Sequence, residues 1–243
     1  MNLKFITYYI ACIILLVGCS SDDTRVMDET DDSTVTVTNV LFIGNSHTYY
    51  NQGLANHLQH FGDSFQVSLL ADEAAQGGYT LENHLASTAT LNAISNTDWD
   101  FIVLQENSYR AAYEREEMLA SISEFSTLLG STNATVLLFQ TWAYQDTPEM
   151  HPLIDQSYSS ASSDTGYAVV RIGRIWNTFI AQYPEISLYS EDDVHPSPAG
   201  TYLTTGLFFK KLFNYSSITG PYQGTLSAEE ASIIQAFVSS TTI

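Results

Sequence analysis

The sequence has 243 residues, of which 44% are hydrophobic and 12% aromatic, and this composition excludes a disordered or fibrous protein. The length suits one α/β domain of about 200–250 residues with a substantial core. Eight Lys and Arg residues stand against 27 Asp and Glu residues, which gives a formal charge of −19. Because so acidic a surface repels phosphate backbones and anionic lipids, we expect no nucleic-acid partner and a neutral or weakly charged substrate.

The first residues are expected to form a targeting segment. Lys4 precedes an apolar run from Phe5 to Val17, 13 residues by count. This run is shorter than the about 20 residues that span a bilayer, and it has the length of a signal-peptide hydrophobic region. It ends in Leu16-Val17-Gly18-Cys19, which resembles a bacterial lipoprotein signal. The resemblance implies that residues 1–18 are removed and that Cys19 carries a lipid; an ordinary signal peptide is the alternative.

Residues 19–35 are rich in Ser, Thr and Asp, a composition that predicts a flexible acidic tether. Ser20 after the cysteine resembles an outer-membrane sorting signal, and the acidic residues that follow resemble a surface-export signal, so either face of that membrane is compatible. Cys12 would be removed and Cys19 lipidated, which leaves no disulfide to stabilise the exported domain. We therefore expect a protein anchored to the bacterial cell envelope, with the lipid as its only membrane contact.

From Thr36 onward, short apolar runs alternate with segments of helical periodicity. The short runs predict strands at Val37–Ile43, Phe65–Leu70, Trp99–Leu104, Thr135–Phe139 and Tyr167–Ile172. The longer segments predict helices at Tyr49–His60, Leu81–Ile94, Tyr113–Leu129, Glu149–Ser160 and Arg174–Tyr183, a further helix at Ala199–Leu212 and a last one after the capping-box pattern Ser227-Ala228-Glu229-Glu230. Five strand–helix alternations predict one domain, residues 36–243, with a parallel sheet covered by helices on both faces.

A possible nucleophile follows the first expected strand. Leu41-Phe42-Ile43 leads directly into Gly44-Asn45-Ser46-His47-Thr48. A glycine allows a sharp turn, and a serine at a strand-to-helix turn lies near the positive end of the next helix, where attack on a carbonyl would be favoured. Helix capping is the alternative, because Ser, Asn and Thr are ordinary N-cap residues.

Two later loops hold possible donors for a developing negative charge. Gln76-Gly77-Gly78-Tyr79 follows the second expected strand, and paired glycines allow a backbone N–H to approach a ligand closely. Leu104-Gln105-Glu106-Asn107-Ser108 follows the third and contains two side-chain amides. Each loop could equally serve only as a turn or a helix cap.

A possible base lies near the C-terminus, in Glu191-Asp192-Asp193-Val194-His195-Pro196. An Asp three residues before a His can fold back onto the imidazole, fix its tautomer and stabilise its charged form. The alternative is an acidic loop with an incidental histidine.

Together, and in this order, the motifs resemble those of the SGNH (GDSL-type) hydrolase family, over about residues 40–212. Gly44-Asn45-Ser46-His47-Thr48 resembles its nucleophile block, Gly78-Tyr79-Thr80 its glycine block, and Asp192-x-x-His195-Pro196 its last block. With Thr141-Trp142, the set is similar to an uncharacterised branch of exported bacterial members. The resemblance implies a flavodoxin-like three-layer α/β/α sandwich with a five-stranded parallel sheet.

The resemblance also implies roles for individual residues. Ser46 would be the nucleophile, His195 the general base and then the general acid, and Asp192 the residue that orients His195. The backbone N–H groups of Ser46 and Gly78 would stabilise the oxyanion.

The chain departs from the family at the third block, which is usually Gly-x-Asn-Asp. Here Gln105-Glu106-Asn107 has neither the Gly nor the second Asp, so either Gln105 or Asn107 could supply the side-chain amide. His47 takes the place of a usually apolar residue and is given no role. Asp193 could replace Asp192 only if the loop turned differently.

The implied reaction is ester hydrolysis through a covalent serine ester, with no metal and no cofactor. His57 and His60 have the spacing of shared metal ligands but lack an acidic or Cys partner beside them. The absence of GxGxxG, Walker and GxSxG motifs disfavours nucleotide use and the α/β-hydrolase fold.

For a lipid-anchored exported protein we expect the substrate to be a small-molecule or glycan ester, with acetyl or other short acyl groups removed from carbohydrates. Aromatic residues near the expected loops could stack on sugar rings: Tyr49, Tyr50, Tyr79, Tyr109, Trp142 and Tyr144. The alternatives are a lipase or lysophospholipase, a catalytically silent glycan-binding envelope lipoprotein, and a purely structural envelope protein.

Overall fold

A computed structural model describes residues 36–243. The expected signal segment, the tether, Cys12 and Cys19 lie outside the described residues. Within residues 36–243, no helix is both long and apolar enough to cross a membrane.

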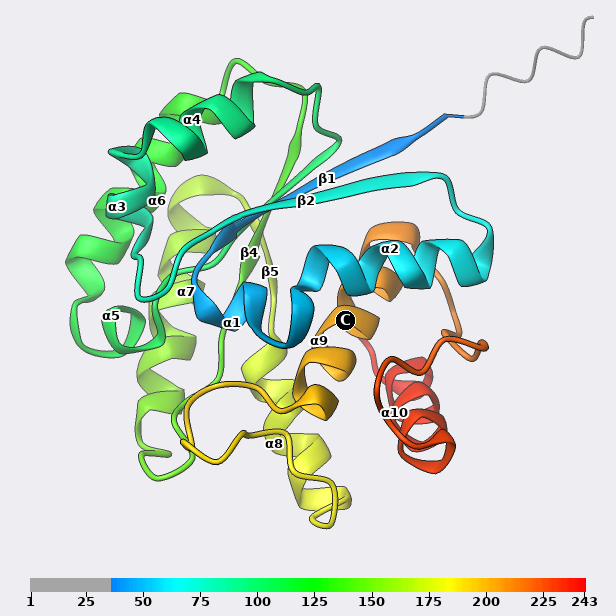
Figure 1. The fold of residues 1–243 in the computed structure, drawn as a ribbon. Helices are drawn as coiled ribbons and strands as arrows, with labels where there is room; N and C mark the ends of the chain where they lie inside the picture. The colour runs from blue at the N-terminus through cyan, green and yellow to red at the C-terminus, as the bar shows by residue number, and fades with distance from the viewer. Residues whose placement is uncertain (1–35) are drawn as a thin grey trace, which may run out of the picture. The chain divides into compact units, whose positions relative to one another are not determined.

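The centre of the fold is a five-stranded sheet in which every neighbouring pair of strands is parallel (Figure 1). The strand order β2-β1-β3-β4-β5 is that of flavodoxin-like folds. This confirms the predicted fold class. The strands are β1 (Thr38–Gly44), β2 (Leu69–Ala75), β3 (Phe101–Leu104), β4 (Thr135–Phe139) and β5 (Ala168–Val170).

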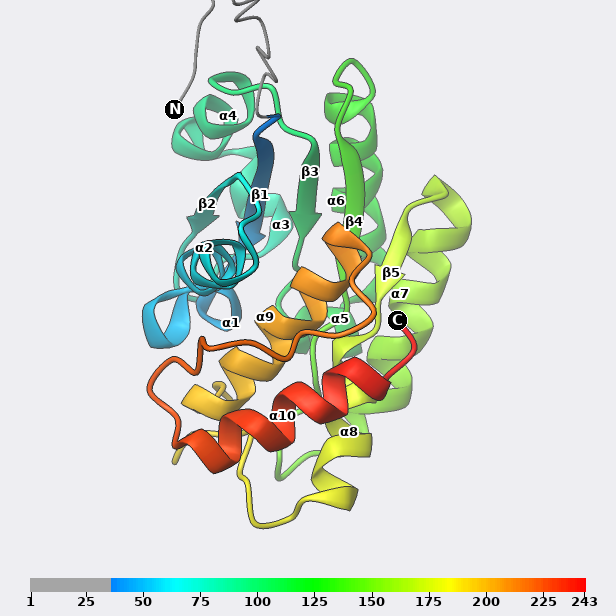
Figure 2. The same cartoon turned by 90° about the vertical axis from the view of Figure 1, so that its right-hand side faces the viewer.

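Helices cover both faces of the sheet because alternate strand residues point to opposite sides. Val40 and Phe42 pack into one core cluster, and Leu41 and Ile43 into the other. The helices on the Phe42 face are α2 (Leu54–Phe65), α8 (Ile172–Gln182), α9 (Pro198–Phe213) and α10 (Ala228–Ser240). Those on the Leu41 face are α3 (Leu81–Leu85), α4 (Thr88–Ser95), α5 (Ser108–Tyr113), α6 (Arg115–Leu129) and α7 (Met150–Thr165) (Figures 1 and 2).

The second expected strand was misplaced. Phe65 is the last residue of α2, and the strand runs over Leu69–Ala75, which includes Asp72 and Glu73. β2 is an edge strand and much of it is exposed, so its sequence lacks the apolar run that marks a buried strand.

Two expected helices are interrupted. In place of a helix from Tyr49 to His60, a four-residue helix α1 (Ser46–Tyr49) and a 3-10 turn (Tyr50–Gln52) precede α2. Asn51, Gln52 and Gly53 all have positive φ angles, which a helix cannot contain. The helix expected at Leu81–Ile94 divides at Ser87, which caps α4. The helix expected at Tyr113–Leu129 is present as α6, which begins two residues later, at Arg115. The capping box at Ser227 and Glu230 is confirmed.

The order of the strands indicates where a ligand would bind. From β1 the chain passes through α2 on one face to reach β2, and then through α3 and α4 on the other face to reach β3. The connections therefore diverge at the carboxyl ends of β1 and β3, which is the position where open α/β sheets bind ligands.

Candidate active site

The turn after β1 is fixed by close packing. Asn45 caps α1 by accepting the His47 N–H, and its own N–H donates to Gln105 Oε1 over 2.8 Å. A Cβ on Gly44 would lie 2.4 Å from Gln105 Oε1 and 2.6 Å from Thr48 Oγ1, so only glycine fits there. Ser46 is therefore held at the first position of α1, where its side chain is 8% exposed.

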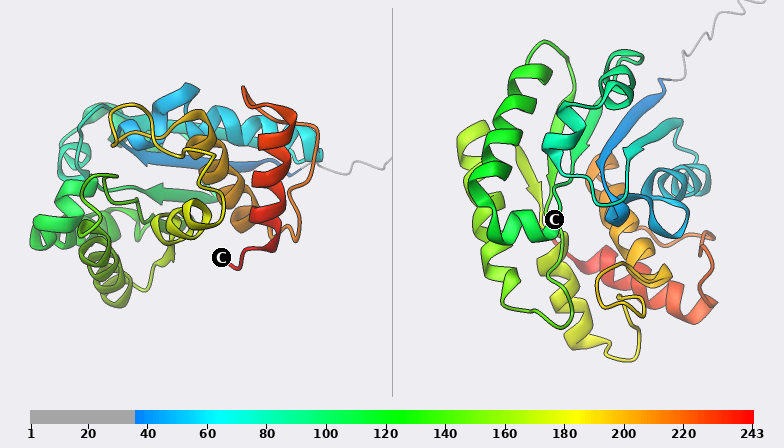
Figure 3. Two further views of the ribbon diagram at one scale, coloured as in Figure 1. Left: turned by 90° about the horizontal axis from the view of Figure 1, so that it is seen from below. Right: turned by 60° about the vertical axis from the view of Figure 1, so that its left-hand side comes forward.

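Ser46, His195 and Asp192 form one hydrogen-bonded chain, although Ser46 and His195 are separated by 149 positions. His195 Nε2 lies 2.8 Å from Ser46 Oγ, and His195 Nδ1 lies 2.6 Å from Asp192 Oδ2. An ionised carboxylate can only accept, so Asp192 fixes the proton on Nδ1 and leaves Nε2 to accept from the Ser46 hydroxyl. Figure 3, left, shows the loop before α9, drawn in yellow, lying beside α1.

Asp192 is kept ionised by the loop that carries it. Partial desolvation favours its protonated form, but the His195 backbone and ring, the Ser190 hydroxyl and the Val194 N–H all donate to it, and together they hold the pKa of Asp192 well below its usual range. Asp193 instead adopts a left-handed conformation, with φ 60°, and its carboxylate makes no hydrogen bond among the described residues. Asp192, and not Asp193, is therefore the carboxylate that is hydrogen-bonded to the imidazole of His195.

The segment after α1 supports His195 from the other side. The ring of Tyr50 stacks on the imidazole with centroids 4.5 Å apart and planes inclined by 12°. Asn51 donates from Nδ2 to the Pro196 carbonyl and to Thr201 Oγ1, each over 2.8 Å. Because these bonds join the nucleophile segment to the residue after His195, they fix the relative position of Ser46 and the imidazole.

The loop between β4 and α7 supports the same histidine loop. Trp142 Nε1 donates to the Val194 carbonyl over 3.0 Å, and the Gln145 N–H donates to the Asp193 carbonyl over 2.8 Å. Trp142 is 1% exposed and stacks on Trp176 at 3.7 Å between centroids, so it cannot stack on a sugar.

Gly78 lies on an exposed loop that is tied to the nucleophile turn. Asn45 Nδ2 donates to the carbonyl of Tyr79, the next residue, over 3.0 Å. Gly78 has φ 72°, a conformation that side chains disfavour, and a Cβ there would meet no atom within 4 Å. The glycine therefore serves the backbone conformation of this loop and is not required by crowding.

The two candidate amides have different surroundings. Gln105 is 1% exposed, its Oε1 accepts from Asn45 N–H and the Thr48 hydroxyl, and its Nε2 donates to the Glu106 carbonyl. The Asn107 Oδ1 caps α5 by accepting the N–H groups of Tyr109 and Arg110, while its Nδ2 has no acceptor among residues 36–243. Asn107 is thus the amide with a free donor.

Glu106 connects the Gly78 loop to the loop after β3. In the sequence it stands out only as part of the departure from the family pattern. It is fully buried, and its carboxylate accepts the Asn107 N–H over 2.6 Å and the Leu81 N–H over 3.3 Å. Leu81 begins α3, three residues after Gly78. Burial raises the pKa of Glu106 to about 7, although these N–H donors and Arg110 favour the charged form.

His47 lies behind the site as a neutral ring. Desolvation and the nearby His195 lower the pKa of His47 to about 3. Its Nδ1 lies 3.2 Å from Asn45 Oδ1, and its ring packs 4.7 Å from that of Trp142. At neutral pH it therefore adds no charge beside His195.

His57 has a role as a hydrogen-bonding residue inside the fold. Its Nε2 lies 2.8 Å from the Asn51 carbonyl and its Nδ1 lies 2.7 Å from the Tyr222 hydroxyl, so both ring nitrogens are engaged. His60 stacks on Tyr222 at the surface. The two histidines that share metal-ligand spacing in the sequence thus both contact Tyr222, His57 through a ring nitrogen and His60 by stacking.

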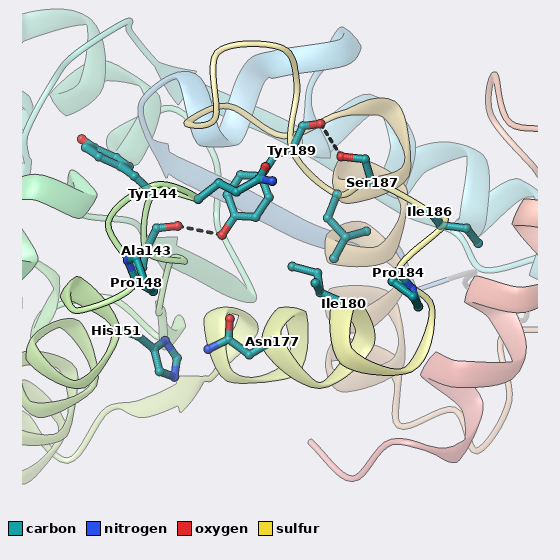
Figure 4. Close-up of a pocket in the computed structure, with 12 residues that line it drawn as sticks. Ala143, Tyr144, Pro148, His151, Asn177, Ile180, Pro184, Ile186, Ser187 and Tyr189 are labelled. Atoms are coloured by element: carbon teal, nitrogen blue, oxygen red, sulfur yellow. Dashed lines mark hydrogen bonds between the residues drawn. The ribbon is translucent and has the colours of Figure 1, made fainter.

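A cavity of about 250 Å³ lies beside the histidine loop, and none of the three residues of the hydrogen-bonded chain lines it. Its walls include Tyr189, His151, Asn177 and Ile180 (Figure 4). The Tyr189 hydroxyl donates to the Ala143 carbonyl over 2.7 Å. This bond connects the loop between β4 and α7 to the segment that leads to His195, so the cavity borders residues that support the histidine loop.

No protein-family model matches the sequence, and no curated protein matches it. Solved structures do match. A DUF4886 family protein from Bacteroides uniformis has a TM-score of 0.68 and 17% identity over 84% of this chain and 94% of its own. A proposed SGNH hydrolase from Slackia heliotrinireducens has a TM-score of 0.61 and 24% identity over 73% of this chain and all of its own. An acetylxylan esterase from Geobacillus stearothermophilus has a TM-score of 0.57 and 13% identity over 73% and 94%. The described residues therefore have the SGNH hydrolase fold.

Proposed function

We propose that residues 36–243 form a serine ester hydrolase. The observation that carries the proposal is the pair of contacts at His195, 2.8 Å to Ser46 Oγ and 2.6 Å to Asp192 Oδ2. A base that is hydrogen-bonded to a hydroxyl and oriented by an ionised carboxylate is the arrangement that activates a serine nucleophile.

In the first half of the reaction, Ser46 Oγ attacks the acyl carbon of the ester while His195 Nε2 takes the hydroxyl proton. The tetrahedral intermediate then expels the alcohol, which receives that proton from Nε2, and an acyl-serine ester is left. In the second half, a water molecule attacks the acyl-serine with His195 again as base, releasing the carboxylic acid and restoring the Ser46 hydroxyl.

The developing oxyanion would be stabilised by the N–H groups of Ser46 and Gly78 and by Asn107 Nδ2. Ser46 is the first residue of α1, so its N–H lacks an intrahelical acceptor. Asn107 is preferred to Gln105 because the Gln105 amide already donates to Glu106. Donors held in place before the reaction lower its barrier by about 3–4 kcal/mol each.

The direct test is hydrolysis of p-nitrophenyl acetate by the purified domain and by Ser46→Ala. We expect turnover by the wild type and a decrease in kcat of at least about 10³-fold in the variant. Among the described residues, no other hydroxyl is hydrogen-bonded to His195. Ser123→Ala, an exposed serine of α6, is the matched control and should behave as the wild type. Equal turnover by Ser46→Ala and the wild type would refute the proposal.

For the substrate we propose short acyl groups, acetyl first, on carbohydrates. The acetylxylan esterase with the same fold and the acidic charge of the chain support this choice. Acetate released from acetylated glycans is the measurement. Release of fatty acid from lipids without release of acetate would favour a lipase or lysophospholipase, and binding of glycans without turnover would favour a silent binding protein.

We also propose that the protein acts at the cell envelope, tethered through a lipid on Cys19. The lipoprotein-like string before Cys19 and the acidic residues after it support this location. Replacing Cys19 with Ser should move the protein from the membrane fraction to the soluble fraction of cells that express the full chain. Retention of the variant in the membrane would contradict the tether.

A further inference from the structure

A cluster of tyrosines lies on and near α5, the helix that Asn107 caps, and has no part in the proposed chemistry. Tyr109 and Tyr113 are one turn apart on α5, with ring centroids 5.1 Å apart. At 51% and 47% exposed, they are the two most exposed large hydrophobic side chains of residues 36–243. Burying aromatic rings is favourable, so two that are left in solvent next to reactive groups mark a contact surface.

Tyr144, from the loop between β4 and α7, completes the cluster. Its hydroxyl is half-buried, which raises its pKa, and the neighbouring hydroxyls of Tyr109 and Tyr113 raise it further. Tyr144 is one of the residues that line the cavity together with His151 and Asn177, and Figure 4 shows its ring directed away from both of them. Because the Tyr109 and Tyr113 hydroxyls affect the Tyr144 hydroxyl, Tyr144 connects this cavity to the tyrosines of α5.

The cluster is connected to both halves of the proposed reaction centre. The Tyr109 N–H donates over 2.9 Å to Oδ1 of Asn107, the proposed oxyanion donor. Gln145, next to Tyr144, donates its N–H over 2.8 Å to the carbonyl of Asp193. The backbone of the cluster is thus joined to the proposed oxyanion donor on one side and to the histidine loop on the other.

The charges around the cluster favour a neutral ligand. Arg110, the cation on α5, is paired with Glu82 at 2.7 Å and Glu114 at 3.1 Å and is only 14% exposed. An anionic ligand would find no free positive charge on this helix and would meet an acidic protein. The tyrosines offer flat apolar faces edged with hydroxyl groups, which match the C–H faces and hydroxyls of a pyranose ring. A fatty acyl chain could use the ring faces but would make no hydrogen bond with the hydroxyl groups, which would stay bonded to water.

We propose that Tyr109, Tyr113 and Tyr144 form a carbohydrate subsite that binds a neutral pyranose ring of a glycan whose ester group lies at Ser46. The subsite rests on the proposed ester hydrolysis and specifies where the non-reacting part of the substrate binds. Its contribution falls on glycan substrates alone, because a p-nitrophenyl ester of acetic acid has no sugar to stack.

The test compares Tyr109→Ala/Tyr113→Ala with the wild type on two substrates, acetylated xylo-oligosaccharides and p-nitrophenyl acetate. We expect KM for the oligosaccharides to rise at least about 10-fold, the equivalent of about 1.4 kcal/mol, with kinetics on p-nitrophenyl acetate within about twofold of wild type. Tyr109→Phe/Tyr113→Phe keeps the ring faces and should lose less than about threefold. Leu128→Ala, an exposed residue at the end of α6, is the control and should change neither substrate.

Three results would overturn the subsite: an unchanged KM for the oligosaccharides, an equal loss on both substrates, or a loss confined to lipid esters in phosphatidylcholine vesicles. If the wild type itself fails to hydrolyse p-nitrophenyl acetate, the proposed function fails and the subsite is tested by binding. Isothermal titration of Ser46→Ala with xylohexaose should then show binding that the tyrosine replacements weaken at least about 10-fold, and no binding would overturn the subsite.

Discussion

Replacing Asp192 with Asn tests whether the carboxylate fixes the tautomer of the proposed base, His195. The introduced amide would keep a carbonyl oxygen to accept from the Val194 and His195 N–H groups, as Asp192 Oδ1 does. Its NH₂ group, however, would face His195 Nδ1 in place of the carboxylate oxygen now 2.6 Å away. Nδ1 would then have to accept, which puts the proton on Nε2 and prevents that nitrogen from taking the Ser46 proton.

The expected loss is about 10³- to 10⁴-fold in kcat on p-nitrophenyl acetate at pH 8, the equivalent of about 4–5.5 kcal/mol of transition-state stabilisation. The fold should be retained, because the backbone contacts of residue 192 survive. The assay is steady-state hydrolysis with circular dichroism of the same preparations.

The neighbouring Asp193→Asn is the matched control. Asp193 has a left-handed backbone, which Asn tolerates well, and its carboxylate makes no hydrogen bond among the described residues. We expect activity within about threefold of wild type, since no reacting group is touched. A loss of less than about tenfold in Asp192→Asn, or an equal loss in both variants, would refute the role given to Asp192.

Three further predictions concern residues around the site. Tyr50→Ala should lower kcat about tenfold and Tyr50→Phe should not, because the ring 4.5 Å from His195 stabilises and positions the imidazolium; similar kinetics in both would refute the stacking. Asn51→Gly keeps the left-handed backbone but loses two hydrogen bonds, so urea unfolding should show about 1–3 kcal/mol less stability, and an unchanged midpoint would contradict the tie to Pro196. Glu106 has a raised pKa of about 7 against an unfolded value near 4.5, so its contribution to stability is largest at low pH and falls as pH rises towards 7. Between pH 5 and 8 the wild type should therefore lose about 2–3 kcal/mol more unfolding free energy than Glu106→Gln, and identical pH dependence would contradict a buried, titrating carboxyl.

The sheet and the nucleophile turn could be predicted because they depend on local signals. β1 is buried on both faces and appears as a continuous apolar run, and the packing around Gly44 makes a glycine obligatory at the turn. The three-residue spacing of Asp192 and His195 likewise allows the contact that the structure contains. The placement of Ser46 and His195 within 2.8 Å of each other agrees with the expectation drawn from the motifs.

The missed features depend on tertiary contacts. Tyr50 and Asn51 were expected inside a helix, and only Gly53 hints at the break; the left-handed backbone at Asn51 is stabilised by its bonds to Pro196 and Thr201, 145 and 150 positions away. Glu106 has the composition of an exposed acidic residue, and nothing local indicates that α3 and α5 enclose it. The predicted position of β2 is wrong for a similar reason. Asp72 and Glu73 are tolerated in a strand at the edge of the sheet, and the local sequence does not show that β2 is an edge strand.

The nucleophile itself can be identified by trapping. Treating the purified domain with a fluorophosphonate and digesting it should give a single phosphonylated peptide, modified at Ser46 in proportion to the activity lost. The same treatment of Asp192→Asn should label far more slowly. Modification at a different serine, or full esterase activity in protein completely phosphonylated at Ser46, would contradict the account.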